Sequence, residues 1–508
     1  MRKLLLGIDA GTTAFKAALF DEKMNALAAA QQDYQLQSRE GNRVEFPAEK
    51  YFRVLCRCVR QLVEKIPSAA GEVCALALSC QGETLVCLDA DGQPLGDAIV
   101  WLDGRAEAEA DALRQRFGRR AVYEITGQSD MTATWPAAKL LWLRSHARER
   151  FARSRRFLLL EDYLLFRLTG QFVGEKNLWA SSAMMNIHTG KWWAEMLAEL
   201  GIGAKALPEL AGSAAPIATL TPEAARATGL NPSVLVAAGA LDQTCNLIGC
   251  GITRPGSVCE STGSCLAVSA VLDSPIPYDE RRPVTCQNHA VPGRYTLLSW
   301  SQSAGMALKW CARELYRDAA SLEEAYARIN QEAENIPIGS DGIVALPYFA
   351  GTAFPEFDGN ARAVFFGANL SHTRGHFAHA VMESVACMLR QNLNLLNAAR
   401  IPVDRVFCMG GGANSPVWLQ IKADIAQTRM VRLRATDSAC RGAAALAGVA
   451  VGMFPSIDAL PNAEISGAVY EPRPTPQAGL VLQRYEELYA VLKPFFQKCA
   501  SQNKEVVS

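Results

Sequence analysis

Three glycine-rich segments of the chain have a composition suited to binding an anion. The first is Asp9-Ala-Gly-Thr-Thr13, with Lys16 just beyond it; the second runs from Asp242 to Ser264 and ends in Ser-Thr-Gly-Ser; the third is Gly410-Gly-Gly-Ala-Asn-Ser415. Glycines let backbone N–H groups approach a phosphate, hydroxyls add donors, and a carboxylate can hold Mg²⁺. None of the segments matches the P-loop or the dinucleotide-binding fingerprint. A P-loop mechanism is therefore excluded.

Apolar runs with strand or helix spacing must position these loops. Residues 3–9 and 15–20 flank the first loop and predict a β-hairpin. The run Val234–Ala240 leads into Asp242-Gln243, and Val406–Met409 leads into the third loop. Helical spacing occurs over residues 48–66, 139–151, 162–168, 305–316 and 373–399. This alternation of strands and helices predicts an α/β fold.

No segment of the sequence resembles a flexible linker between domains. The least regular stretches are residues 275–283 and 461–477, both rich in proline. A chain of 508 residues accommodates two to four domains. We place the boundary at a packed hinge just after the Asp242 segment, which gives an N-terminal domain of residues 1–247 and a C-terminal domain of residues 248–508.

Composition excludes several classes of protein. The 51 basic and 51 acidic residues balance, which argues against nucleic acid as a partner, and 49% hydrophobic residues exclude general disorder. Asp9 interrupts the apolar start, and the late apolar run 443–454 has only about half the length of a membrane span. The 15 cysteines include no Cys-x-x-Cys pair. We expect a cytoplasmic protein with reduced thiols and no membrane partner.

Eight motifs, in order along nearly the whole chain, carry a family resemblance. They are residues Gly7–Thr13, Ser79–Thr84, Val100–Arg105, Asp162–Gly170, Gly239–Gln243, Ser261–Ser264, Gly305–Trp310 and Gly410–Gln420. Each is modest alone, but together in register they make the chain similar to the FGGY family of carbohydrate kinases, in the actin/hexokinase/sugar-kinase superfamily.

The resemblance implies a fold and an activity. The fold would be two ribonuclease-H-like α/β domains of the actin-like ATPase type, closing over a central cleft. The activity would be transfer of the γ-phosphoryl group of ATP, with Mg²⁺, to a hydroxyl of a small sugar or polyol. The N-terminal domain would carry the sugar site and a phosphate loop, and the C-terminal domain the nucleotide site. A homodimer is expected at the family level.

The family motifs also imply roles for individual residues. Asp242 matches the catalytic base, and Asp9 matches the residue that positions Mg²⁺. The positions matching ATP-binding motifs are Gly11, Thr12, Thr13, Lys16, Gly263, Ser264, Gly305, Lys309, Gly411, Gly412 and Asn414. The positions matching the sugar site are Gln81, Glu83, Trp101, Asp103 and Gln243. Carboxylates, amides and an aromatic face suit a polyhydroxylated ligand.

Departures from the family pattern bear on the substrate. Gly82 stands where glycerol kinases usually have arginine, and the Trp101-x-Asp103-x-Arg105 block looks more like that of ketose kinases. The Met-His of xylulokinases is absent, and Gly174-Glu175 replaces a frequent Thr-Asp. A ketopentose such as xylulose is the first expectation. The alternatives are a sugar-independent ATPase of the same superfamily and a catalytically silent sugar-binding regulator.

Simpler structural roles compete with some of these assignments. Asp9 and Asp242 also fit ordinary turn carboxylates, and Glu83 and Asp103 fit structural hydrogen-bond acceptors. Lys16 fits an exposed edge charge, and Trp101 fits a core aromatic. The histidines His372, His376 and His379 have the spacing of one helical face, which two-histidine zinc sites use. No His-Glu-x-x-His pattern accompanies them, so we favour the start of a helix over a metal site.

Overall fold

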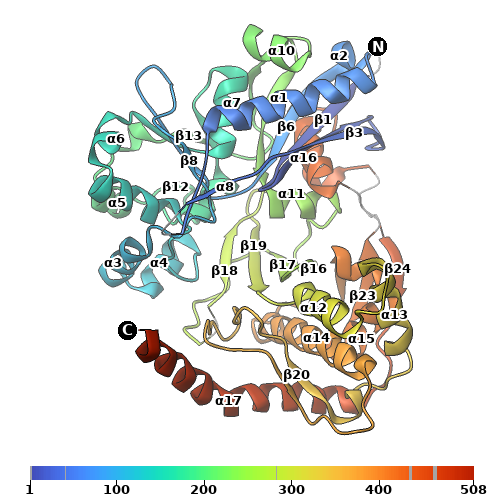
Figure 1. Ribbon diagram of the computed structural model, residues 1–508. Coiled ribbons are helices and arrows are strands. Elements are labelled where there is room, and N and C mark those ends of the chain that lie inside the picture. The colour runs from blue at the N-terminus through green and yellow to red at the C-terminus, as the bar shows by residue number, and fades with distance from the viewer. Residues whose placement is uncertain (1–2, 40–41, 282, 434–436, 462–465, 508) are drawn as a thin grey trace.

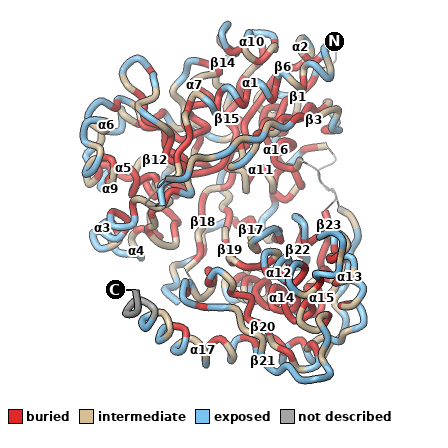
Figure 2. The backbone as a smooth tube through the Cα atoms, viewed as in Figure 1, coloured by how far each residue is buried: buried red, intermediate tan, exposed pale blue. Residues whose placement is uncertain are grey.

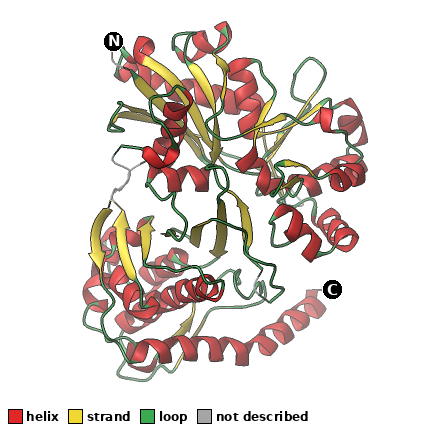
Figure 3. Cartoon of the chain, turned by 180° about the vertical axis from the view of Figure 1, so that it is seen from behind, coloured by secondary structure: helices red, strands yellow, loops and turns green. Residues whose placement is uncertain are grey.

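The computed structural model describes residues 3–39, 42–281, 283–433, 437–461 and 466–507 (Figure 1). It contains two α/β lobes, the first in the upper part of Figure 1 and the second in the lower part, each built on a large mixed sheet. Buried residues follow the strands and the helix faces packed on them (Figure 2). Seen from behind, helices flank both sheets (Figure 3).

The main sheet of the first lobe has the strand order β14-β15-β6-β1-β2-β3. Strands β1 (Leu4–Ala10) and β2 (Ala14–Phe20) form the predicted hairpin, and β3 (Ala26–Asp33) extends it antiparallel. Strands β6 (Val73–Cys80) and β15 (Leu235–Leu241) run parallel to β1. These three strands are buried on both faces, which explains their continuous apolar sequences.

The main sheet of the second lobe repeats this plan. Strands β16 (Val258–Thr262), β17 (Leu266–Leu272) and β19 (Tyr295–Ser301) are antiparallel neighbours. Strands β22 (Arg405–Met409) and β23 (Arg429–Leu433) run parallel to β16. Three antiparallel strands followed by two parallel ones thus occur twice, which confirms the predicted α/β fold with two ribonuclease-H-like domains.

The remaining elements complete the two lobes. In the first lobe they are β4 (Gln37–Arg39), β5 (Arg43–Phe46), β7 (Leu85–Leu88), β8 (Ala98–Ile99), β9 (Arg156–Leu159), β10 (Val173–Glu175), β11 (Met185–Asn186), β12 (Lys191–Trp192), β13 (Glu209–Ala211), β14 (Pro216–Thr219), α1 (Ala48–Lys65), α2 (Ala69–Glu72), α3 (Glu107–Phe117), α4 (Arg119–Thr126), α5 (Pro136–His146), α6 (Arg148–Arg153), α7 (Leu160–Thr169), α8 (Lys176–Trp179), α9 (Ala194–Leu200), α10 (Pro222–Thr228) and α11 (Asp242–Gly249). Later in the chain they are β18 (Thr285–Asn288), β20 (Val344–Leu346), β21 (Val364–Phe366), β24 (Ser466–Tyr470), α12 (Gly305–Leu315), α13 (Leu322–Ala333), α14 (Arg374–Ala398), α15 (Pro416–Ala426), α16 (Ser438–Ala450) and α17 (Gln477–Val507).

Helix α16 belongs to the late part of the chain but packs against the first lobe. It contacts β1, β6, β15 and α11 (Figure 1). The contact is backbone to backbone: a Cβ on Gly7 would lie 1.7 Å from the carbonyl oxygen of Cys440, and one on Gly249 would lie 1.9 Å from that of Ser438. Glycine is therefore required on both facing elements.

Two local predictions were wrong. The expected helix over residues 139–151 is two helices, α5 and α6, because the chain breaks at Ala147, where φ is −128°. The irregular stretch 461–477 contains strand β24, which pairs antiparallel with β23. The prolines of that stretch lie outside the strand, so they do not interrupt its hydrogen bonding.

Three further observations concern the predicted organisation. The boundary predicted between residues 247 and 248 lies inside α11 and stays a prediction, as does closure over a cleft. All 15 cysteines are free thiols, most of them buried. Within the described ranges, no helix has both the length and the apolarity needed to span a bilayer.

Candidate active site

Asp9 lies at the carboxyl end of β1, beside Lys16 of β2 and Ser79 of β6. Ser79 Oγ donates a hydrogen bond to Asp9 Oδ1 at 2.8 Å. Burial raises the pKa of Asp9 above its ordinary value, although the Ser79 hydrogen bond and the charge of Lys16 oppose the shift. The carboxylate is thus held at the edge of the sheet where ligands of open α/β sheets bind.

Asp242 begins helix α11 directly after β15, so it lies at the same sheet edge as Asp9. Strand β15 is irregular near Gly239, where a Cβ would lie 1.6 Å from the carbonyl oxygen of Leu78. The Gly239 amide donates to Glu161 Oε1 at 2.8 Å. The bulge requires glycine at position 239, and it sets the direction in which β15 leads into Asp242.

Burial and two neighbouring carboxylates change the acidity of Asp242. Burial raises the pKa of Asp242 to about 7, and the charges of Asp9 and Glu83 add to the increase. The Gln243 amide donates to Asp242 Oδ1 at 2.6 Å and opposes it. A carboxylate with a pKa near neutrality is suited to accept a proton from a hydroxyl. Gln243 itself is half-buried at the start of α11.

Glu83 has a left-handed backbone, with φ 54°, which is rare outside glycine. Its carbonyl oxygen accepts from Lys139 Nζ at 2.9 Å, and the same ammonium donates to the Val100 carbonyl at 3.0 Å. Burial raises the pKa of Glu83 and lowers that of Lys139. Lys139 of α5 thus ties together the two segments that carry the predicted sugar residues. Sequence reasoning missed it, because nothing local distinguishes a buried helix lysine from an exposed one.

The first glycine-rich loop contacts two of the predicted sugar residues. Trp101 Nε1 donates to Thr12 Oγ1 at 2.9 Å. Gln81 Nε2 donates to the Gly11 carbonyl at 3.5 Å, and Gln81 Oε1 is buried without a partner among the described residues. The structure therefore brings Gln81 and Trp101 to the loop that follows Asp9.

Asp103 lies in the same region but is enclosed by other protein groups. Its Oδ1 accepts from the backbone amide and Nε of Arg105 at 3.0 and 2.7 Å, and its Oδ2 accepts from Arg105 Nη2 and the Val44 amide at 2.7 and 2.6 Å. Arg105 Nη2 also donates to Glu45 Oε1 at 2.7 Å. Both carboxylate oxygens of Asp103 are therefore already used within the protein.

A cavity of about 1000 Å³ in the second lobe collects the nucleotide residues predicted there. The predicted residues that line it are Gly263, Ser264, Gly305, Lys309, Gly411, Gly412 and Asn414. They come from the loop after β16, from helix α12 and from the loop after β22. Residues that are far apart in the sequence thus line one cavity, which is large enough for a nucleotide.

Close backbone approach explains the glycines around this cavity. A Cβ on Gly305 would lie 2.2 Å from the carbonyl oxygen of Gly263, and the Gly305 amide donates to that oxygen at 3.0 Å. Asn414 is held by Arg432, whose Nη2 donates to Asn414 Oδ1 at 2.9 Å. Asn330 lines the cavity as well and accepts from Ser415 Oγ at 2.6 Å, a contact between distant segments that the sequence did not reveal.

The other predicted ATP-binding residues lie on the first lobe and do not line this cavity. Gly11, Thr12 and Thr13 form the turn between β1 and β2, and Lys16 follows on β2. Lys16 Nζ lies 3.7 Å from Asp437 Oδ1, next to the start of α16. The predicted ATP-binding residues therefore form two groups, one on each lobe.

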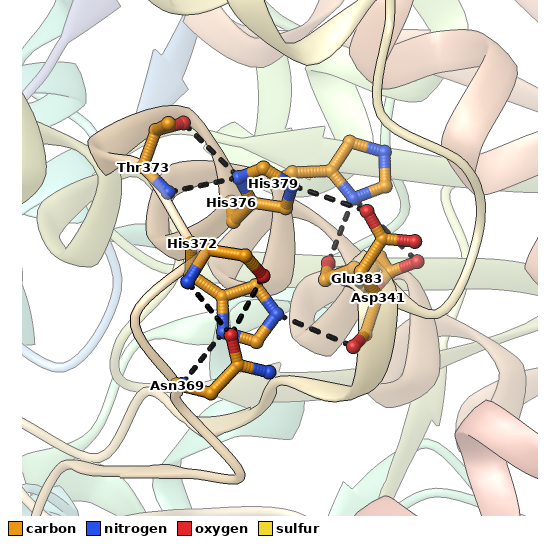
Figure 4. Close-up of polar contacts among 9 residues, drawn as sticks. Asp341, Asn369, His372, Thr373, His376, His379 and Glu383 are labelled. Atoms are coloured by element: carbon orange, nitrogen blue, oxygen red, sulfur yellow. Dashed lines mark hydrogen bonds and ion pairs between the residues drawn. The ribbon is translucent and has the colours of Figure 1, made fainter.

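The three histidines of the possible metal site lie at the start of α14, as favoured from the sequence (Figure 4). The ring nitrogen Nδ1 of each is already engaged within the protein. His372 and His376 each accept from the backbone amide three residues earlier, that of Asn369 and that of Thr373, and His379 is hydrogen-bonded to Ser340 Oγ at 2.8 Å. Among the described residues, no group of three or more histidine, cysteine or acidic side chains is arranged to hold a metal ion.

The chain is similar to known carbohydrate kinases over nearly its whole length. A xylulose kinase of Bacillus subtilis (strain 168) is 29% identical over 501 residues, covering 97% of each chain. A gluconokinase of the same organism is 26% identical over 505 residues, covering 98% of this chain and 95% of its own. The crystal structure of xylulose kinase from Rhodospirillum rubrum has a TM-score of 0.89 and 28% identity, over 97% of this chain and 100% of that one.

The family models give the assignment directly. The N-terminal domain model of the FGGY family of carbohydrate kinases matches residues 4–249, and the C-terminal domain model matches residues 261–451. These matches confirm the family expected from the eight motifs. The chain belongs to the FGGY family of carbohydrate kinases, enzymes that use ATP to phosphorylate a hydroxyl of a small sugar or polyol.

Proposed function

We propose that this enzyme phosphorylates a neutral ketopentose, with xylulose as the first candidate and Asp242 as the base. The observation that carries the proposal is the position and acidity of Asp242: it lies at the same sheet edge as Asp9, and its pKa is raised to about 7. The Asp242 carboxylate accepts the proton of the sugar hydroxyl as that oxygen attacks the γ-phosphorus. A new O–P bond forms, the bond from the γ-phosphorus to the bridging oxygen breaks, and ADP leaves.

We further propose how the chain holds both substrates. Gln81, Glu83, Trp101 and Gln243 bind the sugar, whereas Asp103 acts through the side chain of Arg105, since its own oxygens are occupied. ATP lies in the cavity of the second lobe, bound by Gly263, Ser264, Gly305, Lys309, Gly411, Gly412 and Asn414. Gly11, Thr12, Thr13 and Lys16 approach its phosphates from the first lobe.

We assign Asp9 to Mg²⁺, and the donor set fits that ion. Asp9 Oδ1 is fixed by Ser79, while Oδ2 receives no hydrogen bond from the described residues. Magnesium is usually bound by one or two carboxylates together with phosphate oxygens and waters, so a cage of several protein ligands is not needed. When bound, Mg²⁺ supplies charge neutralisation for the transferring phosphoryl group.

The charges of the sugar region favour a neutral acceptor over an aldonate such as gluconate. Lys139 is fully buried and donates to two carbonyl oxygens, and Arg105 is bound to Asp103 and Glu45. The nearby carboxylates of Asp242 and Glu83 would repel the carboxylate of gluconate. An aldonate would need Lys139 released from its two carbonyl oxygens or Arg105 released from its ion pairs, and either release carries a cost.

An ADP-release assay with MgATP tests the proposal. The acceptors are D-xylulose, L-xylulose, D-ribulose, L-ribulose, glycerol, xylitol, ribitol and gluconate, with a no-sugar control. Stimulation by a ketopentose supports it, and stimulation by gluconate alone refutes the neutral-acceptor assignment. Turnover without any sugar would favour the ATPase alternative; no turnover, with a sugar-dependent increase in Tm, would favour the silent regulator.

We retain a homodimer and a cytoplasmic location as proposals drawn from the family resemblance. Light scattering on the purified chain measures the first, and fractionation of the producing cells measures the second.

A further inference from the structure

Three buried polar side chains of the second lobe form a closed ring. Lys422 Nζ donates to Glu260 Oε1 at 2.7 Å and to Thr262 Oγ1 at 2.7 Å, and Thr262 Oγ1 donates to Glu260 Oε2 at 2.6 Å. The side chains of Lys422 and Glu260 are both 0% exposed. Each of the three groups is therefore bonded to the other two, away from water.

This ring, the Glu260–Thr262–Lys422 triad, lies directly behind the nucleotide cavity. Thr262 lines the cavity and immediately precedes Gly263 and Ser264, whereas Glu260 and Lys422 do not line it. Lys422 Nζ also lies 5.0 Å from the ring centroid of Trp418, another lining residue. Both charges thus support the wall of the cavity from the side opposite to the ligand.

Thr262 in turn supports the third glycine-rich loop. A Cβ on Gly410 would lie 2.8 Å from the Thr262 carbonyl oxygen, and one on Gly412 would lie 2.7 Å from Thr262 Cβ and Cγ2. The loop after β22 is therefore packed directly on the backbone and side chain of Thr262. A displacement of Thr262 would move two of the three segments that line the cavity.

Stability alone is a weak explanation for such a pair. Desolvating two charges is expensive, and replacing a buried ion pair by apolar residues is often neutral or stabilising. A fully bonded ring does, however, fix the orientation of its members, because each alternative orientation leaves a buried charge or hydroxyl unpaired. The benefit of the triad is then the geometry that it imposes on Thr262.

We propose that the Glu260–Thr262–Lys422 triad is a positioning element that sets the affinity for nucleotide and leaves the affinity for the sugar unchanged. Its role rests on the nucleotide site proposed above. Lys422 and Glu260 act through Thr262 and touch no substrate. Rigid support of this kind matters because a binding loop displaced by a fraction of an ångström loses several contacts at once.

Calorimetric titration with MgADP, which needs no turnover, tests the triad on the full chain. Thr262→Val keeps the shape of the side chain but removes the shared hydroxyl, and Thr262→Ser keeps the hydroxyl. Thr296→Val is the matched control, because Thr296 of β19 is a buried threonine whose hydroxyl has no partner among the described residues. The double variant Glu260→Met/Lys422→Met removes both charges together, so no uncompensated charge is left to unfold the protein.

We expect the Kd for MgADP to increase about tenfold in Thr262→Val and in the double variant, since each loses hydrogen bonds that involve a charged group. Thr296→Val should stay within about twofold of the parent protein. Thr262→Ser keeps the hydroxyl but loses the methyl group packed on Gly412, so it should bind MgADP more tightly than Thr262→Val and less tightly than the parent. KM for the sugar should not change. An unchanged Kd in both disrupted variants, or a parallel loss of sugar affinity, would overturn the positioning role. No MgADP binding by the parent chain would instead refute the proposed nucleotide site.

Discussion

The acidity of Asp242 gives the reaction rate a defined dependence on pH. With a pKa of about 7, the carboxyl is about 9% ionised at pH 6 and about 91% ionised at pH 8. Only the ionised form accepts a proton, so kcat/KM for the sugar should rise about tenfold over that range and then level off. Coupled ADP release from about pH 5.5 to pH 9 measures this, with MgATP kept saturating so that protonation of free nucleotide does not contribute.

The variant Asp242→Asn shows whether the pH dependence of the rate comes from Asp242 or from another titrating group. The kcat of the variant should fall by about 10²–10⁴-fold, the usual contribution of a general base. Its residual rate should no longer increase between pH 6 and pH 8. Its affinity for MgADP should be preserved, because Asp242 does not line the nucleotide cavity. An unchanged kcat, or an acid limb retained in the variant, would refute the assignment of the base.

Three further perturbations have definite expected outcomes. Lys139→Met should increase KM for the sugar about tenfold with little change in KM for ATP, because it releases the carbonyls of Glu83 and Val100; equal changes in both KM values would contradict this. Gly305→Ala should abolish MgADP binding in titration, since its Cβ would lie 2.2 Å from the Gly263 carbonyl oxygen, and normal binding would show that the loop is free to move. Burial raises the pKa of Asp162 to about 8, so its contribution to stability is complete below about pH 4 and is lost as pH rises through 8. Urea unfolding at pH 6 and pH 8 should show the parent losing about 2 kcal/mol more than Asp162→Asn; equal losses would show that Asp162 does not titrate in this range.

Regular elements of this fold could be predicted because their signals are local. The hairpin around Asp9 follows from two apolar strands separated by a polar turn, and α14 follows from helical spacing over residues 373–399. Strand β24 could not be predicted, because its residues become a strand only by pairing with β23. The break between α5 and α6 carries neither glycine nor proline, so the sequence gives no signal for it.

The candidate site could likewise be predicted only where its residues belong to local motifs. Asp9, Asp242 and the glycines of the three loops belong to recognisable motifs, and the structure places the loops of the second lobe around one cavity. Lys139 and the Glu260–Lys422 pair were missed, because the pairing of Glu260 with a residue 162 positions away depends on the complete tertiary fold. Asp103 could be identified from its local motif, but the sequence did not reveal that Arg105 and Val44 occupy its carboxylate oxygens.

The position of helix α16 has a consequence for how the chain acquires its structure during synthesis. The ribosome releases β1, β6 and α11 long before α16, yet α16 covers Leu5, Ala75 and Cys245 in a shared core. Until that helix emerges, the first lobe exposes an apolar groove, and domain-by-domain folding from the N-terminus cannot be completed. A nascent chain stalled before residue 438 should therefore remain sensitive to protease in its first lobe and become resistant only after the helix has docked.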